Sequence, residues 1–422
     1  MKIFIQEFVS GGGLSDQDLD ASLVVEGFGM LRVLASNCKK LGYNVTSTLD
    51  KRFKFLTHFL EIDHLVKISP NESFIEEGKK LLQNNDYFLV IAPGTGGLLS
   101  NIINEYSNTT SQSLNCESKA IDFATDKSRV YEFCTKSGFN IPKTIKIAKD
   151  GSCWLLVKNQ AKRKIEGIDH YQKWEINYPL IIKPNEGVAC EGIKLCRTQE
   201  ELLTALRENK GKEMLIQEFI FGDNLSVTAY VWKEQIDILA INEQIVSLGN
   251  DKSEYLGGIS NVKHFLSKEI STFCLELLSK IDGLQGFVGI DIIVSKSDKN
   301  DREIFLIEIN PRVTTPICGL MNQNNKPINL MPTIGEFHFP KQFDVTYFAK
   351  AKFSFPVSPK NHPFTTLMSN PSIITPPISF DGTNIYSLIR GSGKNTRKAN
   401  RNFNEKLAAL SNKLKNEFLA RY

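Results

Sequence analysis

The chain has 422 residues, of which 41% are hydrophobic and 23% are charged, and its formal net charge is +4. This is the composition of a globular protein with room for roughly two to four structural units. No apolar run reaches about 18 residues, and the first residues have a strand pattern, so we expect neither a membrane span nor a secretory signal, and a cytoplasmic protein. The eight cysteines form no Cys-x-x-Cys pair, which favours reduced thiols over a zinc site.

The N-terminal part alternates strand-like and helix-like segments. Residues 2–9, 43–48 and 87–92 have strand patterns, and residues 23–41 have a helical period. Glycine clusters at 10–13 and 94–97 follow two of these strands, at the edge where open α/β domains bind ligands. Neither cluster is a dinucleotide fingerprint or a P-loop. They either border a substrate pocket or form tight turns.

The next region combines lysines with a glycine-containing loop. A helix is predicted to begin after Asp126-Lys127 and to end before Gly138. A strand over residues 179–184 ends in Lys183-Pro184, and residues 185–193 form a small-residue loop. Such a loop can donate backbone N–H groups to phosphate oxygens, and a lysine can add charge there. Taken alone, these features also fit a surface lysine and an ordinary hairpin turn.

A strand, a turn and a second strand follow the next predicted helix, over residues 214–220, 221–224 and 225–232. A strand of this kind can present a side-chain acceptor and a backbone N–H to an adenine edge. It can equally be a strand pair that binds no ligand.

Residues 307–312, Ile-Glu-Ile-Asn-Pro-Arg, point to a cation site. Alternate residues of a strand share a face, so Glu308 and Asn310 project to the same side. The strand-like residues 287–294 precede them across a polar turn at 295–301, and pairing of the two strands would bring Asp291 beside Glu308. Carboxylates at apolar strand positions need a compensating charge, and Mg²⁺ prefers one or two carboxylates together with substrate phosphates. The alternative is that these acids only meet lysines on an exposed face.

The basic charge is concentrated at the C-terminal end. Residues 390–422 carry a net charge of +7, so the rest of the chain sums to −3. Such a segment could bind nucleic acid. However, apolar residues recur there at spacings of three and four, which predicts an amphipathic helix with a solvated basic face. These residues are Ala399, Phe403, Leu407, Leu410, Leu414 and Phe418. We therefore do not expect nucleic-acid binding. A β-hairpin is predicted before it, over residues 373–389.

These motifs, in this order, resemble the ATP-grasp superfamily over roughly residues 1–335. The resemblance implies a mixed α/β and α+β fold in four parts. These are a pre-ATP-grasp α/β domain (1–115), a small lid domain (116–216), a large catalytic domain (217–335) and an added C-terminal extension with the hairpin and the basic helix (336–422).

The resemblance also implies a set of site residues. ATP would lie between the lid and the catalytic domain, with residues 187–192 as the phosphate loop. The cofactor-binding residues would be Lys127, Lys183, Glu186, Gly187, Gly192, Gln217, Glu218, Phe219, Ile220 and Asn224. Magnesium, with manganese as a substitute, would be held by Asp291, Glu308 and Asn310. Arg312 and Lys183 would be catalytic, with Arg312 on the phosphoryl group or the substrate carboxylate.

Two positions depart from the superfamily pattern. Asn224, next to Asp223, stands where many relatives have an acid that binds ribose. Gly289 stands where some relatives have an arginine before the first metal acid, so Arg312 would take over that charge.

Three segments resemble the tyramine:glutamate ligase group within the superfamily. They are residues 7–13, residues 91–97, and Asn242-Glu243-Gln244 followed by residues 255–258. This resemblance implies a substrate site at Gly12, Gly13, Tyr255, Gly257, Gly258 and Arg312.

We therefore expect an ATP- and Mg-dependent carboxylate–amine ligase that forms an amide through an acyl phosphate. Its partners would be a small carboxylate and a small amine, with glutamate as one option for the acid, and a homodimer is left open. The alternatives are a grasp-type kinase or carboxylase, or a non-catalytic nucleotide-binding protein.

Overall fold

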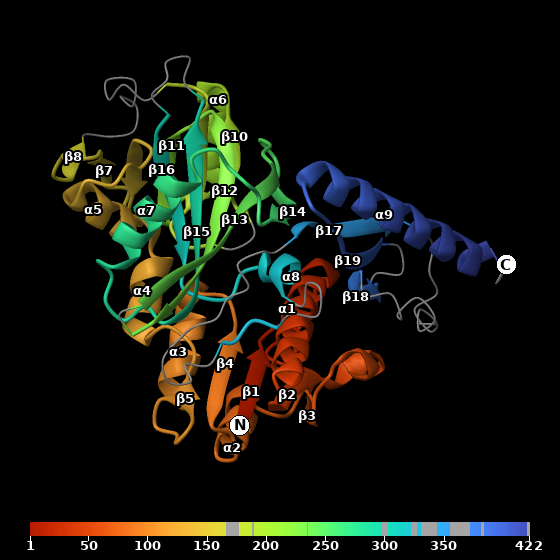
Figure 1. Cartoon of the computed structure of the whole chain (residues 1–422). Coiled ribbons are helices and arrows are strands. Elements are labelled where there is room, and N and C mark those ends of the chain that lie inside the picture. Colours follow the sequence, from red (N-terminus) through yellow and green to blue (C-terminus); the bar gives the residue numbers. More distant parts are fainter. Residues whose placement is uncertain are drawn as a thin grey trace.

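The computed structural model describes residues 1–165, 177–187, 190–233, 235–296, 302–321, 327–330, 344–354, 372–380 and 384–419, with side chains to residue 415. Its strands form three sheets, of five, six and eight strands. Figure 1 shows the first sheet at one end of the molecule and the other two above it.

The N-terminal sheet is parallel, with strand order β3-β2-β1-β4-β5. The predicted alternation of strands and helices is confirmed. Phe4 of the central strand packs with α2 and α3, whereas Ile3 and Ile5 pack with α1, as strand alternation requires. The elements are β1 (Lys2–Glu7), α1 (Ala21–Lys40), β2 (Asn44–Asp50), η1 (Lys51–Phe59), β3 (His64–Ile68), α2 (Phe74–Leu82), β4 (Tyr87–Ile91), η2 (Thr95–Gly97), α3 (Leu98–Tyr106) and β5 (Gln112–Ser113).

The six-stranded sheet is antiparallel, with order β10-β9-β11-β6-β7-β8. The elements of this region are α4 (Ser118–Thr125), α5 (Lys127–Ser137), β6 (Thr144–Ile147), β7 (Cys153–Leu156), β8 (Arg163–Ile165), β9 (Leu180–Pro184), β10 (Lys194–Cys196), α6 (Gln199–Glu208) and β11 (Met214–Glu218). All of β11 pairs within this sheet, so the expected boundary at residue 216 falls inside a strand.

The eight-stranded sheet is also antiparallel, with order β16-β15-β12-β13-β14-β17-β19-β18. Its elements are β12 (Gly222–Trp232), β13 (Gln235–Ser247), β14 (Glu254–Ser260), α7 (Ser267–Leu278), β15 (Gly286–Ser295), β16 (Ile304–Asn310), α8 (Ile317–Leu320), β17 (Val345–Ser354), β18 (Ile373–Ile378) and β19 (Asn384–Gly393). The predicted C-terminal hairpin is β18–β19, and with β17 it continues the sheet of β12–β16.

The predicted basic helix is α9 (Thr396–Leu419), which lies against β17 and β19 in Figure 1. Ala399, Phe403, Leu410 and Leu414 of its apolar stripe are buried, and Leu407 packs against the same cluster. The amphipathic expectation is therefore confirmed, except at Phe418, whose side chain is outside the described residues. Among those residues, no helix is both long and apolar enough to span a membrane.

The C-terminal strands also contact α1 of the N-terminal unit. The Arg32 guanidinium donates hydrogen bonds to the carbonyl oxygens of Ile373 and Ile374, at 2.9 and 2.8 Å. The Thr375 hydroxyl donates to the Val25 carbonyl. One side of α1 is thereby fixed against β18, and this arrangement positions one wall of the site described next.

Candidate active site

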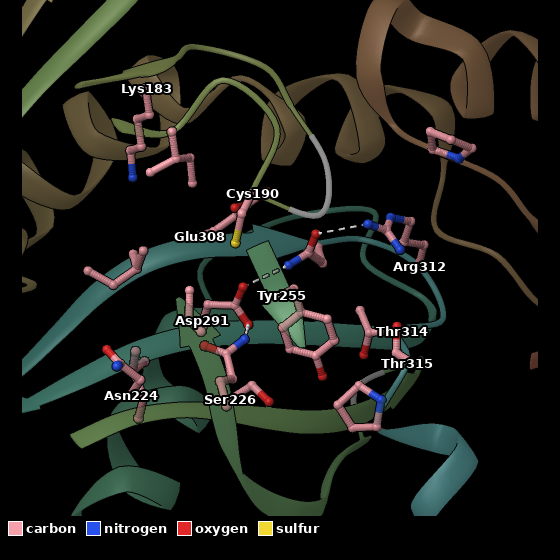
Figure 2. Close-up of a pocket in the computed structure, with 18 of the residues that line it drawn as sticks. Lys183, Cys190, Asn224, Ser226, Tyr255, Asp291, Glu308, Arg312, Thr314 and Thr315 are labelled. Atoms are coloured by element: carbon pink, nitrogen blue, oxygen red, sulfur yellow. Dashed lines mark hydrogen bonds between the residues drawn. The ribbon is translucent and has the colours of Figure 1, made fainter. Parts of the chain in front are cut away.

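Asp291 and Glu308 are directly opposite each other on the paired strands β15 and β16, as the sequence predicts. Asn310 lies opposite Gly289, and this pair is two residues along the strands from the pair of Asp291 and Glu308. The Asp291 carboxylate accepts a hydrogen bond from Gln244 at 3.0 Å and a longer one from Asn310 at 3.4 Å. Figure 2 shows these contacts and the Arg312 guanidinium beyond Asn310. Three oxygen-bearing side chains therefore converge in one place.

Lys127 lies beside this group. Its Nζ is 3.2 Å from Glu308 Oε1, and only 5% of its side chain is exposed. Asp126 caps α5 by accepting from the Arg129 N–H, and it also accepts from the side chain of Asn185. The start of α5 is thus tied to the first residue after β9, which keeps Lys127 near the carboxylates.

Lys183 projects from β9 toward the same group. Its Nζ donates to the Tyr131 hydroxyl at 2.9 Å, and that hydroxyl donates to the Ile307 carbonyl at 2.5 Å. Burial lowers the pKa of Lys183 to about 7, and the charge of Lys127 acts in the same direction. An anion bound here would restore the charged form of the lysine.

The pKa of the Asp291 carboxylate is shifted in the opposite direction. Burial raises the pKa of Asp291 to about 7, and the facing charge of Glu308 adds to the effect. Carboxylate oxygens are the hard donors that Mg²⁺ prefers, so Asp291 and Glu308 fit that ion. The Asn310 amide nitrogen faces Asp291 and its oxygen accepts from Arg312, so Asn310 would have to turn to add its oxygen. Among the described residues, no three His, Cys, Asp or Glu side chains form a metal cluster, so the fit rests on this two-acid set.

These side chains line a cavity of about 280 Å³ between the three sheets. In Figure 2, Lys183 and Asn224 lie on one side of Asp291, and Arg312, Thr314 and Thr315 lie on the other. The predicted residues along its wall are Lys183, Gln217, Glu218, Phe219, Ile220, Asn224, Tyr255, Asp291, Glu308, Asn310 and Arg312. Lys127 is not among the residues that line the cavity, but it contacts Glu308, which is.

The end of β11 forms the wall where adenine was expected. The Gln217 amide donates to the Thr144 hydroxyl at 2.8 Å, and Glu218 accepts from the Lys143 N–H at 2.7 Å. Both side chains are thus held toward β6. The neighbouring wall is apolar and includes Ile181, Ile193 and Ile292.

The loop after β9 contacts the N-terminal unit. Glu186 accepts a hydrogen bond from the Gly96 N–H at 2.8 Å, so this loop meets the second glycine cluster. Gly187 and Gly192 pack close to the Pro184 ring, and Gly192 has a φ of +71°. Cys190 lines the cavity as well. Residues 188 and 189 of the expected phosphate loop are outside the described residues.

Four glycines expected in the substrate site are packed closely against other parts of the protein. A Cβ on Gly12 would come within 2.5 Å of Ile68, and one on Gly13 within 2.3 Å of Phe8. Gly257, with a φ of +144°, and Gly258 are packed in β14. Among the described residues, none of the four lines the cavity, so their contact with substrate stays a prediction.

Comparison with known proteins gives the family. Residues 124–316 match an ATP-grasp domain and residues 43–121 match a pre ATP-grasp 3 domain. The chain is 30% identical over 323 residues to tyramine--L-glutamate ligase of Methanocaldococcus fervens, an alignment that covers 76% of this chain and 90% of the relative. The chain belongs to the ATP-grasp family of carboxylate–amine ligases. The predicted family and enzyme class are therefore confirmed.

Solved structures share the ATP-grasp fold. An ATP-grasp superfamily protein from Archaeoglobus fulgidus has a TM-score of 0.59 at 22% identity, covering 92% of this chain and 99% of that one. The N5-carboxyaminoimidazole synthetase of Staphylococcus aureus, complexed with ADP, has a TM-score of 0.61 at 12% identity, covering 96% of each chain. At these identities the structural similarity confirms the predicted fold and gives no information on substrates.

Some residues in and around this ligase cavity were not predicted from the sequence. Leu23, Glu26 and Met30 line it from α1, and Tyr131 supports Lys183 from α5. Glu26 had a detectable signal, because it is a charged residue on an otherwise apolar helix stripe. Lys350, which pairs with Glu26, had none, because the two residues are brought together only by the packing of β17 against α1.

Proposed function

We propose that this ligase uses ATP and Mg²⁺ to join a small carboxylate to a small amine through an acyl phosphate. One observation carries the proposal. A partly buried pair of carboxylates, two lysines and an arginine converge at one side of a single cavity, and the cavity continues past them toward an apolar wall. This arrangement suits a charged phosphoryl transfer followed by capture of a second substrate.

ATP would occupy the side of the cavity beside β11. Its adenine would contact Gln217, Glu218, Phe219 and Ile220, and its ribose would lie near Asn224. Lys127, Lys183 and the loop of Glu186, Gly187 and Gly192 would bind the phosphates. The depressed pKa of Lys183 supports this role, because a buried amine that loses its charge without a partner regains it beside a phosphate.

Asp291, Glu308 and Asn310 would hold the magnesium. When bound, the ion would neutralise charge that develops on the phosphoryl oxygens. Lys127 would then share the charge of Glu308 with the metal, which keeps the lysine close to the phosphates.

The first step would be attack of a substrate carboxylate oxygen on the γ-phosphorus of ATP. The bond to the β,γ-bridging oxygen breaks, and ADP and an acyl phosphate form. The amine nitrogen then attacks the acyl carbon, phosphate leaves, and the nitrogen loses a proton to give the amide. Arg312 would orient the carboxylate, for which its planar guanidinium is well shaped. Enclosure of the cavity would protect the acyl phosphate from water.

The name of the relative supplies the first substrates to test, L-glutamate and tyramine. The experiment is a screen of acids against amines with ATP and magnesium, reading ADP release and product mass. A product mass equal to both substrates minus water supports ligation. A phosphorylated final product would indicate a kinase instead, and bicarbonate dependence would indicate a carboxylase. ATP binding with no ADP release for any pair would indicate a non-catalytic protein.

Three further expectations are proposals of the same kind. They are the domain limits 1–115, 116–216, 217–335 and 336–422, with the limit at 216 moved to the end of β11 at Glu218, a cytoplasmic location, and a homodimer. Limited proteolysis, cell fractionation and light scattering test them in turn.

A further inference from the structure

One face of α1 forms the wall of the cavity that lies away from the lysines. Leu23, Glu26, Gly27 and Met30 line the cavity, and their spacing of three, four and seven places them on one face of the helix. Val9, Tyr255 and Pro316 complete an apolar wall around the single carboxylate that α1 contributes. A charged group is therefore set among apolar side chains at the far end of the site.

The Glu26 side chain is held from two directions. Its Oε1 lies 2.5 Å from Lys350 Nζ of β17, and its Oε2 accepts a hydrogen bond from the Thr315 hydroxyl at 3.0 Å. The Lys350 ammonium also donates to the Ser22 hydroxyl at 3.0 Å. Within the described residues Oε1 is buried and accepts no hydrogen bond, and the Lys350 ammonium at 2.5 Å is its ionic partner. A carboxylate has about four acceptor sites, so the contacts with Lys350 and Thr315 leave room for a further donor.

A second carboxylate lies next to it but is fully occupied. Both oxygens of Glu7 accept hydrogen bonds from Val9 and Ser10, and burial raises the pKa of Glu7. Gly27 allows the close approach of α1 to this acid, because a Cβ there would come within 2.5 Å of Glu7 Oε1. Both acids line the cavity, and Glu26 is the one on the helix face whose Leu23 and Met30 form the apolar wall.

Glu26 is also within electrostatic reach of the reaction centre. Burial lowers the pKa of the Arg312 guanidinium, and Glu308, Asp291 and Glu26 all act against that lowering. A ligand on Glu26 would therefore lie between an apolar wall and the arginine.

We propose that Glu26 binds the ammonium group of the amine substrate, which releases one proton to solvent before its nitrogen attacks the acyl carbon, and that Lys350 of the C-terminal extension positions this carboxylate. The substrate class is a primary amine on an apolar body, because the walls around Glu26 are apolar. This inference rests on the proposed ligase function and assigns its second substrate a site.

The experiment measures the two half-reactions separately in Glu26→Gln. Hydroxylamine traps the acyl phosphate as a hydroxamate and reports the first step, whereas amide formation with n-butylamine or phenethylamine reports the second. We expect the KM for these amines to rise about tenfold to a hundredfold, as for loss of a charged hydrogen bond, with hydroxamate formation changed less than about threefold. Lys350→Met should raise the same KM by a smaller factor without changing the KM for ATP, and Lys350→Arg should restore it.

The control is a more exposed lysine–glutamate pair within the N-terminal unit, Lys79 and Glu105, whose charged atoms are also 2.5 Å apart and which does not line the cavity. Glu105→Gln and Lys79→Met should leave both half-reactions unchanged. An unchanged amine KM in Glu26→Gln, or a rise in the KM for the carboxylate instead, would overturn the assignment. If wild-type protein forms no hydroxamate with any acid, the proposed function fails. Calorimetric titration with n-butylamine then decides the site, since binding must occur in wild type and disappear in Glu26→Gln.

Discussion

The two ends of the cavity are built in different ways. At the nucleotide end, the acids sit on adjacent strands and the lysines on the elements packed beside them, so short segments of sequence fix their geometry. At the other end, the wall combines α1, the start of β14, the residues after Arg312, and Lys350 on β17. Under the proposals above, the chemistry is specified locally, whereas selectivity depends on long-range packing. Substitutions at one end of the cavity should therefore change the phosphoryl chemistry, and substitutions at the other end should change substrate selectivity.

The largest effect is expected at the nucleotide end. Glu308→Gln should keep the fold but reduce turnover by on the order of a hundredfold or more, because one electrostatic stabiliser of the transferring phosphoryl group is lost. ADP release under saturating substrates is the measurement, with a thermal unfolding curve as the check on folding. Near-normal turnover of a folded variant would remove Glu308 from the proposed metal site.

Nucleotide binding should depend on pH through Lys183. Its pKa in the free protein is about 7, so the lysine loses its charge as the pH rises through that value. Bound phosphate would raise that pKa, so binding takes up a proton above pH 7. We expect the affinity for ATP to fall by up to about tenfold per pH unit there. Calorimetry in buffers of different ionisation enthalpy measures the proton uptake.

The Lys183 variant provides the control for this pH dependence. Lys183→Met should bind ATP weakly at every pH and should lose this component of the pH profile. Retention of the same profile in that variant would assign it to another group.

A smaller effect is expected at Tyr131. Tyr131→Phe removes the hydroxyl between Lys183 Nζ and the Ile307 carbonyl, so the lysine loses its alignment with the strand that bears Glu308. The KM for ATP should rise about threefold to tenfold, as for loss of one buried hydrogen bond, while the KM for the amine stays constant. Equal changes in both constants would show that the hydroxyl supports the fold generally.

The smallest kinetic effect is expected at Gly257. This glycine has a φ of +144°, and a Cβ there would come within 2.2 Å of the Phe348 carbonyl oxygen. Gly257→Ala is therefore strained, with a loss of about 1–3 kcal/mol of stability. Urea unfolding measures that loss. Substrate KM values that stay constant in the folded fraction would favour packing as the role of this glycine. A large rise in KM would restore the predicted substrate contact.

The same contrast explains what the sequence could predict. Strand periodicity placed Glu308 and Asn310 on one face, and the hairpin connection brought Asp291 opposite Glu308, because both are local properties. Ser22 and Lys350 are 328 positions apart, and no periodicity relates them. The glycine clusters leave two readings open for a similar reason. A turn that needs a glycine looks the same in sequence whether it borders a ligand or, as at Gly12, the side chain of Ile68.

The continuation of the large sheet into β17 has a consequence for shortened forms of this protein. β17 pairs with Gly257 to Ser260 of β14, so removal of everything after residue 335 would leave those backbone amides and carbonyls without partners. An open sheet edge of this kind is a template for joining another chain. A shortened protein that ended where the family resemblance ends would therefore be expected to self-associate along β14, the strand that carries Tyr255.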